Sequence, residues 1–202
     1  MTTFFLIRHA LCDGLGQTLW GRTPNIRLNH EGKTQAERLA ETCEGVGFDA
    51  VYSSPLERAL ETADALASRL KLDVRKSAAL NEIDYGEWSG KTFEQLHSDQ
   101  RWRHFNNRRS TTNIPGGESF VEVQNRVVKE IDRLSGEHSK GRVALVSHAD
   151  PIRAAIAYFA TTAIDLIERF EISPCSVSVI VAGDENVKLL TINHRLNGFS
   201  ER

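Results

Sequence analysis

The sequence is poor in cysteine, and its three cysteines are far apart. Cys12, Cys43 and Cys175 are odd in number, and none stands in a C-x-x-C pair. Such a set argues against a disulfide framework and against a zinc knuckle, because both need closely spaced pairs. We therefore expect a protein of a reducing compartment, and the cytoplasm is the natural location.

Long apolar runs and an excess of charge are also missing. Only the four apolar residues 4–7 precede Arg8, too few for the core of a signal peptide or for a membrane span. The formal net charge is -2, so no field that would attract nucleic acid or a membrane surface is expected. At 202 residues, the chain suits one hydrophobic core, and we predict a single domain over residues 1–202.

What the sequence does contain is a pair of short apolar runs that each lead to a histidine. Residues 4–7 are followed at once by Arg8 and His9, and residues 142–147 lead into His148. Both runs have the length and composition of buried strands. Ligands of open α/β sheets bind at the edge where parallel strands end, so both histidines are predicted to reach that edge.

Strand-like and helix-like segments alternate along the chain, which is the signature of an α/β fold. Further strands are predicted over residues 48–52 and 73–77, and residues 176–181 and 187–192 predict an antiparallel hairpin. We expect a three-layer α/β/α sandwich with a mostly parallel central sheet, closed by this C-terminal hairpin. A loose tail is expected after His194.

One helix start carries a strong local signal. Ser54, Pro55 and Glu57 have the spacing of a capping box with proline at the first helical position, which predicts that Ser54 caps this helix. Arg58 would then lie in the first turn, just beyond a strand. Its guanidinium group should reach the sheet edge that carries His9.

Residues 80–90 form a turn-rich segment that concentrates carboxylates and aromatic side chains. Glu82 is the candidate acid of this segment, with Asp84 and Glu87 as alternatives for the same proton transfer. The basic cluster of the chain follows at residues 101–109. We interpret this cluster as a solvated or interfacial face rather than as part of a substrate site.

The side chains predicted to meet at the sheet edge are cations or potential cations. Arg8, Arg58, His9 and His148 would repel one another unless an anion joined them, and a phosphoryl dianion suits two guanidinium groups. The predicted helix starts nearby would add backbone N–H donors. The arginines disfavour a metal cation, so the sequence predicts a phosphate site with neither metal nor cofactor.

Five motifs, in this order, resemble a known family. They are Arg8-His9, residues 53–62 (SSPLERALET), residues 80–90 (LNEIDYGEWSG), residues 115–119 (PGGES) and Ser147-His148. Each motif alone is weak, but all five in sequence are specific and cover most of the chain. The chain resembles the histidine phosphatase superfamily, also called phosphoglycerate mutase-like, and looks most like its short bacterial phosphatases, such as the α-ribazole phosphatases.

By this resemblance, His9 is the nucleophile that takes the phosphoryl group, and water then hydrolyses the phosphohistidine. Arg8, Arg58 and His148 would hold the phosphoryl oxygens and offset the charge that develops in an in-line transfer. Glu82 would protonate the leaving oxygen and later activate water, which requires a raised pKa. The neighbouring arginines would lower the pKa of His9 and so favour its neutral, nucleophilic form.

Some positions depart from the family pattern. The residue after the nucleophile is usually glycine and here is Ala10, so the backbone must avoid a positive φ there. Leu15 stands where the family often has an asparagine that helps bind phosphate. Gly21 and Arg22 match the family's next loop contact, and Ala149 replaces a glycine whose N–H faces phosphate. The resemblance thus implies substrate contacts from Gly21, Arg22 and Ala149 in an altered site.

The sequence favours a phosphomonoesterase that acts on a small phosphorylated metabolite. The segment between Glu82 and Pro115 is short compared with the insertion of the family's glycolytic mutases, and a mutase needs such structure to exclude water. A mutase-like phosphotransferase and a non-catalytic phosphate-binding regulator are the alternatives. The expected partners are the substrate and a second copy of the chain in a homodimer, without nucleic acid or membrane.

Overall fold

A computed structural model of the chain describes residues 1–183 and 186–195. The tip of the predicted hairpin at 184–185 and the tail from residue 196 onward lie outside the described residues. The strands are β1 Thr2–Arg8, β2 Ala50–Ser53, β3 Val74–Lys76, β4 Arg142–Ser147, β5 Val177–Ala182 and β6 Val187–His194. The α-helices are α1 His30–Thr42, α2 Glu57–Leu70, α3 Phe93–Ser98, α4 Gln100–Asn107, α5 Phe120–Glu137 and α6 Ala149–Phe159. The 3-10 helices are η1 Ala78–Leu80, η2 Gly86–Trp88 and η3 Ile164–Arg169.

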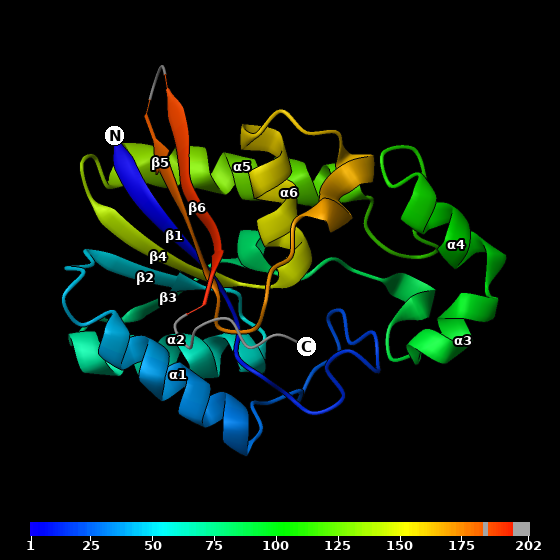
Figure 1. The fold of residues 1–202 in the computed structure, drawn as a ribbon, viewed down its shortest axis with the longest axis horizontal. Coiled ribbons are helices and arrows are strands. Elements are labelled where there is room, and N and C mark those ends of the chain that lie inside the picture. Colours follow the sequence, from blue (N-terminus) through cyan, green and yellow to red (C-terminus); the bar gives the residue numbers. More distant parts are fainter. Residues whose placement is uncertain (184–185, 196–202) are drawn as a thin grey trace.

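The strands form one sheet in the order β3-β2-β4-β1-β5-β6 (Figure 1). The pairs β3–β2, β2–β4 and β4–β1 are parallel, whereas β5 runs antiparallel to both β1 and β6. The expected mostly parallel sheet with a C-terminal antiparallel hairpin is thus confirmed. Because β1 and β4 are neighbours, their carboxyl ends and the residues that follow them lie side by side.

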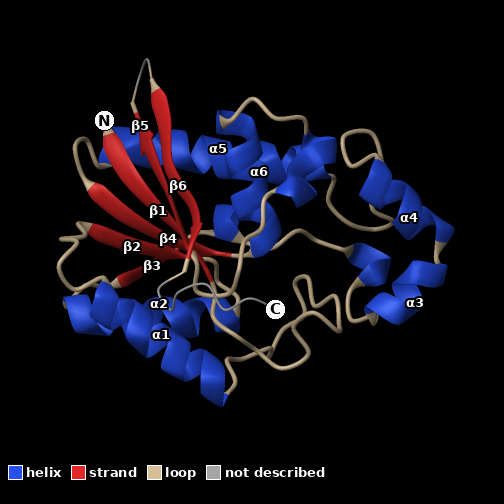
Figure 2. Cartoon of the chain, in the orientation of Figure 1, coloured by secondary structure: helices blue, strands red, loops and turns tan. Residues whose placement is uncertain are grey.

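Helices cover both faces of the sheet, as Figure 2 shows. On one face, α1 and α2 pack on a core that includes Leu39, Leu66 and Val146. On the other face, α5 and α6 pack on a second core, with Ile131 and Leu145 fully buried in it. Parallel strands that are buried on both faces read as continuous apolar runs, which is why the sequence identified β1 and β4 so readily.

A third core lies beyond the carboxyl edge of the sheet, under α3 and α4 at the right of Figure 1. Trp88, Trp102 and Phe105 pack against one another there, with ring centroids 5.3–5.8 Å apart. These side chains are buried and connect the two short helices to the start of α5. This outer unit forms one side of the site described below.

The prediction that Ser54 caps helix α2 is wrong. The helix begins at Glu57, and its N-cap is Leu56, whose side chain makes no capping hydrogen bond. Ser54 is fully buried, and its hydroxyl donates to Asn81 Oδ1 at 2.9 Å. The local sequence favours a cap, but the side chain is drawn into the site by partners distant in the sequence. Arg58 still falls in the first turn of α2, as expected.

Within the described residues, each helix is too short or too polar to pass through the apolar interior of a bilayer.

Candidate active site

The two histidines meet at the carboxyl edge of the sheet. Arg8 and Ser147 are paired across β1 and β4, and His9 N–H donates to Ser147 O at 2.9 Å. His9 and His148 come directly after these residues. The centroids of their rings lie 5.0 Å apart, and the angle between the ring planes is 61°. Both are buried. The predicted meeting of the two strand ends is therefore confirmed.

The hydrogen bonds of His9 fix its tautomer. Nδ1 lies 2.7 Å from Ala10 O, an acceptor only, so Nδ1 carries the proton. Nε2 then keeps its lone pair and accepts a hydrogen bond from Arg58 Nε at 3.2 Å. Burial, followed by the charges of Arg58 and Arg8, holds the pKa of His9 well below its ordinary value. The ring is thus neutral at pH 7, with its nucleophilic nitrogen turned toward the arginines.

The two arginines are held by backbone carbonyls rather than by carboxylates. Arg58 Nη2 donates to Gly21 O at 2.7 Å, and Arg8 Nη1 donates to Ile172 O. Within residues 1–183 and 186–195, no carboxylate oxygen lies within 4.0 Å of either guanidinium group. Arg8 Nε and Arg58 Nη1 are buried without a hydrogen-bond partner in the same described part. Buried donors without partners cost free energy unless a ligand satisfies them.

Gly21 contributes its main chain to this arrangement. Its φ of +51° suits glycine, and a Cβ added there would lie 3.1 Å from both Ser89 Oγ and Tyr85 Cδ2. The left-handed turn aims the Gly21 carbonyl at Arg58. The observed role of Gly21 in the site is thus to hold the Arg58 guanidinium group through its backbone carbonyl.

His148 is held from behind by a polar chain. Its Nε2 lies 2.9 Å from Ser54 Oγ, whose own proton is donated to Asn81 Oδ1. The ring must therefore donate from Nε2, which leaves Nδ1 as the buried atom without a partner among the described residues. Burial, with the charge of Arg58 next, places the pKa of His148 well below its ordinary value. A bound dianion would oppose these effects and favour a second N–H at Nδ1.

We expect Ser54→Ala to lower kcat by up to about a hundredfold, because the ring of His148 loses the partner that orients it. Ser53→Ala is the matched control: Ser53 is equally buried, but its hydroxyl donates to the backbone oxygen of Ser54. Steady-state kinetics on both variants, with Ser54→Thr as the conservative rescue, test this role. Equal losses in the two alanine variants would reduce Ser54 to a packing residue.

Glu82 is the carboxylate of its loop that lines the cavity. Its Oε1 accepts from the N–H of Ile83 at 3.0 Å. Burial first, and then the negative charge of Asp150, raises the pKa of Glu82 to about 7. The alternatives point elsewhere, since Asp84 accepts from Gly86 N–H and Glu87 pairs with Arg101 at the surface. The geometry thus favours Glu82 over both.

The loop of Glu82 is fixed by the motif at residues 115–117. A Cβ on Gly86 would lie 2.2 Å from Pro115 O, and a Cβ on Gly117 would lie 2.3 Å from Asp84 O. Two of the motifs found in the sequence therefore pack backbone against backbone. Only glycine permits this approach, so the spacing of the motifs reflects contact between them.

Arg22 lies behind Glu82 rather than in the cavity. Its Nε donates to Glu82 O at 2.8 Å, and its Nη2 donates to Glu118 Oε2 at 2.8 Å. Glu118 also accepts from Arg126. The side chain of Arg22 is therefore engaged in holding the Glu82 loop, whereas Gly21 and Ala149 line the cavity.

The departures from the family pattern are accommodated. Ala10 does not have a positive φ, as expected, and its N–H donates to Thr62 Oγ1 at 3.1 Å. Leu15 lines the cavity and presents a hydrocarbon side chain there. The wall at that position therefore has no side-chain donor for a phosphate oxygen.

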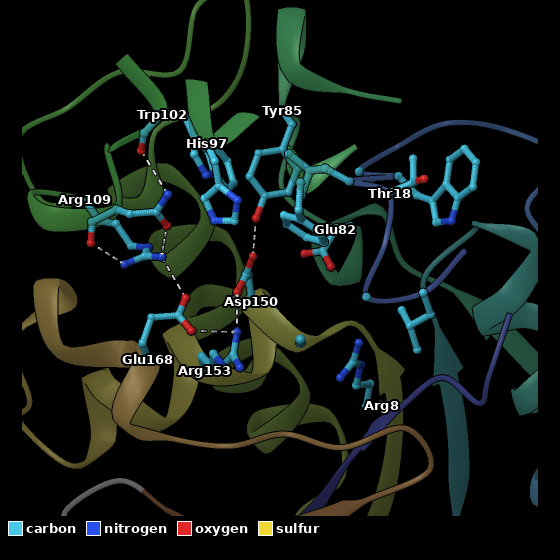
Figure 3. A pocket seen from close by; sticks show the side chains of 18 of the residues that line it. Arg8, Thr18, Glu82, Tyr85, His97, Trp102, Arg109, Asp150, Arg153 and Glu168 are labelled. Carbon is cyan, nitrogen blue, oxygen red and sulfur yellow. Dashed lines mark hydrogen bonds and ion pairs between the residues drawn. The ribbon is translucent and has the colours of Figure 1, made fainter. Parts of the chain in front are cut away.

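A cavity of about 540 Å³ opens from His9 toward the outer unit (Figure 3). Arg8 lies at one end of the view, and His97, Trp102 and Arg109 lie at the other. The interpretation of residues 101–109 as only a solvated or interfacial face is wrong, because Arg103 and Arg109 both line the cavity. Arg109 is only 5% exposed. Helix α4 turns this part of the cluster inward because Trp102 and Phe105 pack beneath it.

The sequence did not identify three other polar residues of the cavity. Asp150 and Arg153 lie in the first turns of α6, and Glu168 lies in η3. Arg153 Nη1 donates to Asp150 Oδ1 at 3.1 Å, and Tyr85 donates its hydroxyl to the other oxygen. The i, i+3 spacing of Asp150 and Arg153, directly after His148, was the available signal.

Comparison with known proteins agrees with this geometry. Residues 4–195 match the model of the histidine phosphatase superfamily, branch 1. Phosphoserine phosphatase 1 of Hydrogenobacter thermophilus is 31% identical over 96% of this chain and 92% of its own length. The 2,3-bisphosphoglycerate-dependent phosphoglycerate mutase of Thermoplasma acidophilum is 30% identical over 95% of this chain and 92% of its own.

Solved structures share the fold. The α-ribazole phosphatase from Shigella flexneri superposes with a TM-score of 0.85 at 26% identity, covering 98% of this chain and 100% of that one. The sheet, the paired histidines and these matches define a phosphoryl-transfer enzyme of the phosphohistidine type. The chain belongs to the histidine phosphatase superfamily, as its motifs suggested, and is a phosphoric monoester hydrolase.

Proposed function

We propose that the protein hydrolyses a small phosphorylated metabolite by transferring its phosphoryl group to Nε2 of His9 and then to water. One observation carries the proposal: three buried nitrogens, Arg8 Nε, Arg58 Nη1 and His148 Nδ1, have no partner within the described chain, and they belong to the side chains gathered at His9. Donors from two guanidinium groups match the oxygens of a tetrahedral dianion. The two guanidinium groups are in place before the substrate arrives, as electrostatic catalysis requires, and His148 gains its second N–H when the dianion binds.

In the first step, His9 Nε2 attacks phosphorus in line with the leaving oxygen. Arg8, Arg58 and His148 donate to the non-bridging oxygens, where charge accumulates as the bonds change. The phosphorus–oxygen bond to the alcohol breaks, and a phosphorus–nitrogen bond forms. The Ala10 carbonyl, which accepts from Nδ1, stabilises the positive charge that the ring acquires.

Glu82 serves both steps. Its raised pKa, about 7, keeps a useful fraction protonated near neutral pH, so it can give a proton to the departing alkoxide. In the second step, the resulting carboxylate takes a proton from water, which attacks the phosphohistidine and releases inorganic phosphate. Desolvation favours the neutral acid, whereas Arg58 and Arg8 favour the carboxylate, so both forms are accessible.

The direct test is a rapid-quench reaction with p-nitrophenyl phosphate. The proposal expects inorganic phosphate as product and an acid-labile phosphoryl group on His9, located by mass spectrometry. Turnover without a phosphorylated His9 would overturn the covalent mechanism. An acid-stable adduct on another residue would do the same.

We expect EDTA to leave the rate of phosphate release unchanged. The anion is bound by guanidinium and imidazole groups, and a divalent cation placed among them would be repelled. The assay compares rates with and without the chelator. A further sample receives Mg²⁺ or Mn²⁺ after the EDTA treatment, to test whether metal restores any lost activity. A loss restored by metal would contradict this mechanism.

A mutase is the runner-up because one relative bears that name. Such an enzyme would return the phosphoryl group to a second hydroxyl and would need priming by a bisphosphate. Incubation with 3-phosphoglycerate, with and without 2,3-bisphosphoglycerate, separates the two activities. Isomer formation that exceeds phosphate release would replace the hydrolase proposal.

Four further expectations stay proposals. The three buried free cysteines support a cytoplasmic location, and one family match over residues 4–195 supports a single domain. A homodimer is the assembly to test by light scattering.

The relatives support a phosphorylated small molecule as the ligand, since one solved complex contains phosphoserine and another contains 3-phosphoglyceric acid.

A further inference from the structure

The cavity is much larger than the phosphate site. Its volume of about 540 Å³ falls within the range of pockets that hold drug-sized ligands. The group that leaves after phosphoryl transfer must occupy the part beyond Glu82. The chemistry of the walls there indicates what kind of alcohol fits.

One wall is a continuous chain of paired charges, drawn with dashed lines in Figure 3. Tyr85 and Arg153 both donate to Asp150, and Arg153 lies 3.6 Å from Glu168. Arg109 Nη2 in turn donates to Glu168 Oε1 at 2.7 Å. The wall thus contains two guanidinium groups and two carboxylates, and each carboxylate contacts a guanidinium group. Its net charge is zero, in contrast to the phosphate end.

Another part of the lining is apolar and aromatic. Leu15, Leu19 and Trp20 contribute from the loop after β1, and Phe93 and Trp102 contribute from α3 and α4. Trp102 and Phe93 lie with ring centroids 6.3 Å apart. A flat ring is the shape that such a surface covers best.

The side chains of His97 and Arg103 line the rim. Arg103 donates to His97 O at 2.6 Å, and both side chains are exposed. Water and salt screen exposed charges, so the Arg103 guanidinium group draws phosphate esters toward the opening but binds a second anion weakly.

We propose that this far part of the cavity binds an uncharged, hydroxylated alcohol that carries a ring, of the sugar or nucleoside kind, and that it disfavours a second anionic group. The inference rests on the proposed phosphatase function. Hydroxyl groups can add to the paired carboxylates and guanidinium groups without separating them. A carboxylate would meet Asp150 and Glu168, and would have to displace one of them to reach a guanidinium group.

The test begins with esters whose leaving groups are all primary alcohols. Glycerol 3-phosphate and 3-phosphoglycerate share a three-carbon skeleton and differ in a carboxylate, whereas uridine 5′-monophosphate and glucose 6-phosphate each add an uncharged ring. We expect kcat/KM to be at least about tenfold higher for glycerol 3-phosphate than for 3-phosphoglycerate, and higher again for a ring-bearing ester. The two ring-bearing esters distinguish a nucleoside from a sugar.

A charge-switch variant tests the wall itself. Glu168→Gln leaves Arg109 and Arg153 with one carboxylate between them, and the side chain is 53% exposed, so the fold tolerates the change. We expect the ratio of kcat/KM for 3-phosphoglycerate to that for glycerol 3-phosphate to rise about tenfold. Glu171→Gln is the matched control, because Glu171 approaches Arg153 only to 4.0 Å and does not line the cavity. Its ratio should stay within about twofold of the wild type.

The outcomes separate the two proposals. If the wild type releases no phosphate even from p-nitrophenyl phosphate, the phosphatase proposal is wrong. If it hydrolyses p-nitrophenyl phosphate but prefers 3-phosphoglycerate to glycerol 3-phosphate, only the proposal for the far part of the cavity is wrong. An unchanged ratio in Glu168→Gln, or an equal rise in Glu171→Gln, would also overturn the subsite.

Discussion

His9→Ala is expected to lower kcat for phosphate release by about 10⁶-fold, the size of loss seen when the nucleophile of a serine protease is removed. The substitution removes the attacking nitrogen but leaves Arg8, Arg58 and His148 in place. The variant should therefore still bind inorganic phosphate. Parallel measurement of turnover with p-nitrophenyl phosphate and of phosphate binding by calorimetry separates lost chemistry from a lost site.

His104→Ala is the matched control for this experiment, since His104 is an exposed histidine of α4 that does not line the cavity. Its rate should equal that of the wild type. Wild-type rates in His9→Ala would show that another group attacks phosphorus. Absence of turnover in the wild type itself, with phosphate binding intact, would favour the non-catalytic regulator.

Glu82→Gln is expected to have the second-largest effect, and the effect should depend on the leaving group. General acid catalysis contributes about 10²–10⁴-fold, so hydrolysis of glycerol 3-phosphate should fall by that factor. The loss should be much smaller for p-nitrophenyl phosphate, because p-nitrophenolate leaves without a proton. Similar losses on both substrates would mean that Glu82 is not the acid. Glu87→Gln, on the same loop but at the surface, is the control.

The pH profile provides a second readout for Glu82. A pKa raised to about 7 means that the carboxyl is protonated below this pH and ionised above it. When phosphoryl transfer to His9 limits the rate, kcat for an alkyl phosphate should fall as the pH rises through about 7. The Glu82→Gln variant should lack this fall in kcat. If kcat of the variant still falls through the same pH range, another group is responsible for the pH dependence.

Much of the site was predictable because it depends on short segments. The apolar runs before His9 and His148 are buried on both faces, and neighbouring parallel strands deliver both rings to one edge. Arg58 follows the next strand of the sheet by a few residues, so its position was also fixed locally. The loop with Glu82 was recognisable from its glycines, which allow it to pack on residues 115–117.

The wrong predictions concern residues whose contacts with distant segments outweigh the preferences of the local sequence. Ser54 has every local feature of a helix cap, yet its hydroxyl donates to Asn81 and accepts from His148 instead. Arg109 looked like a surface charge because its neighbours are basic and polar. Its burial depends on how α4 packs over the third core and on Glu168, far along the chain. Neither contact can be deduced from spacing alone.

The third core has an evolutionary meaning. The groups that grip the phosphoryl moiety follow strands whose separation is set by main-chain ladders, whereas α3 and α4 rest on an independent aromatic platform around Trp88 and Phe105. Exposed residues of α3 and α4 that line the cavity, such as His97 and Arg103, can therefore change without moving Arg8, His9 or His148. A lineage with this architecture can acquire new substrates by changing the cavity-facing residues of α3 and α4, and it keeps its reaction throughout.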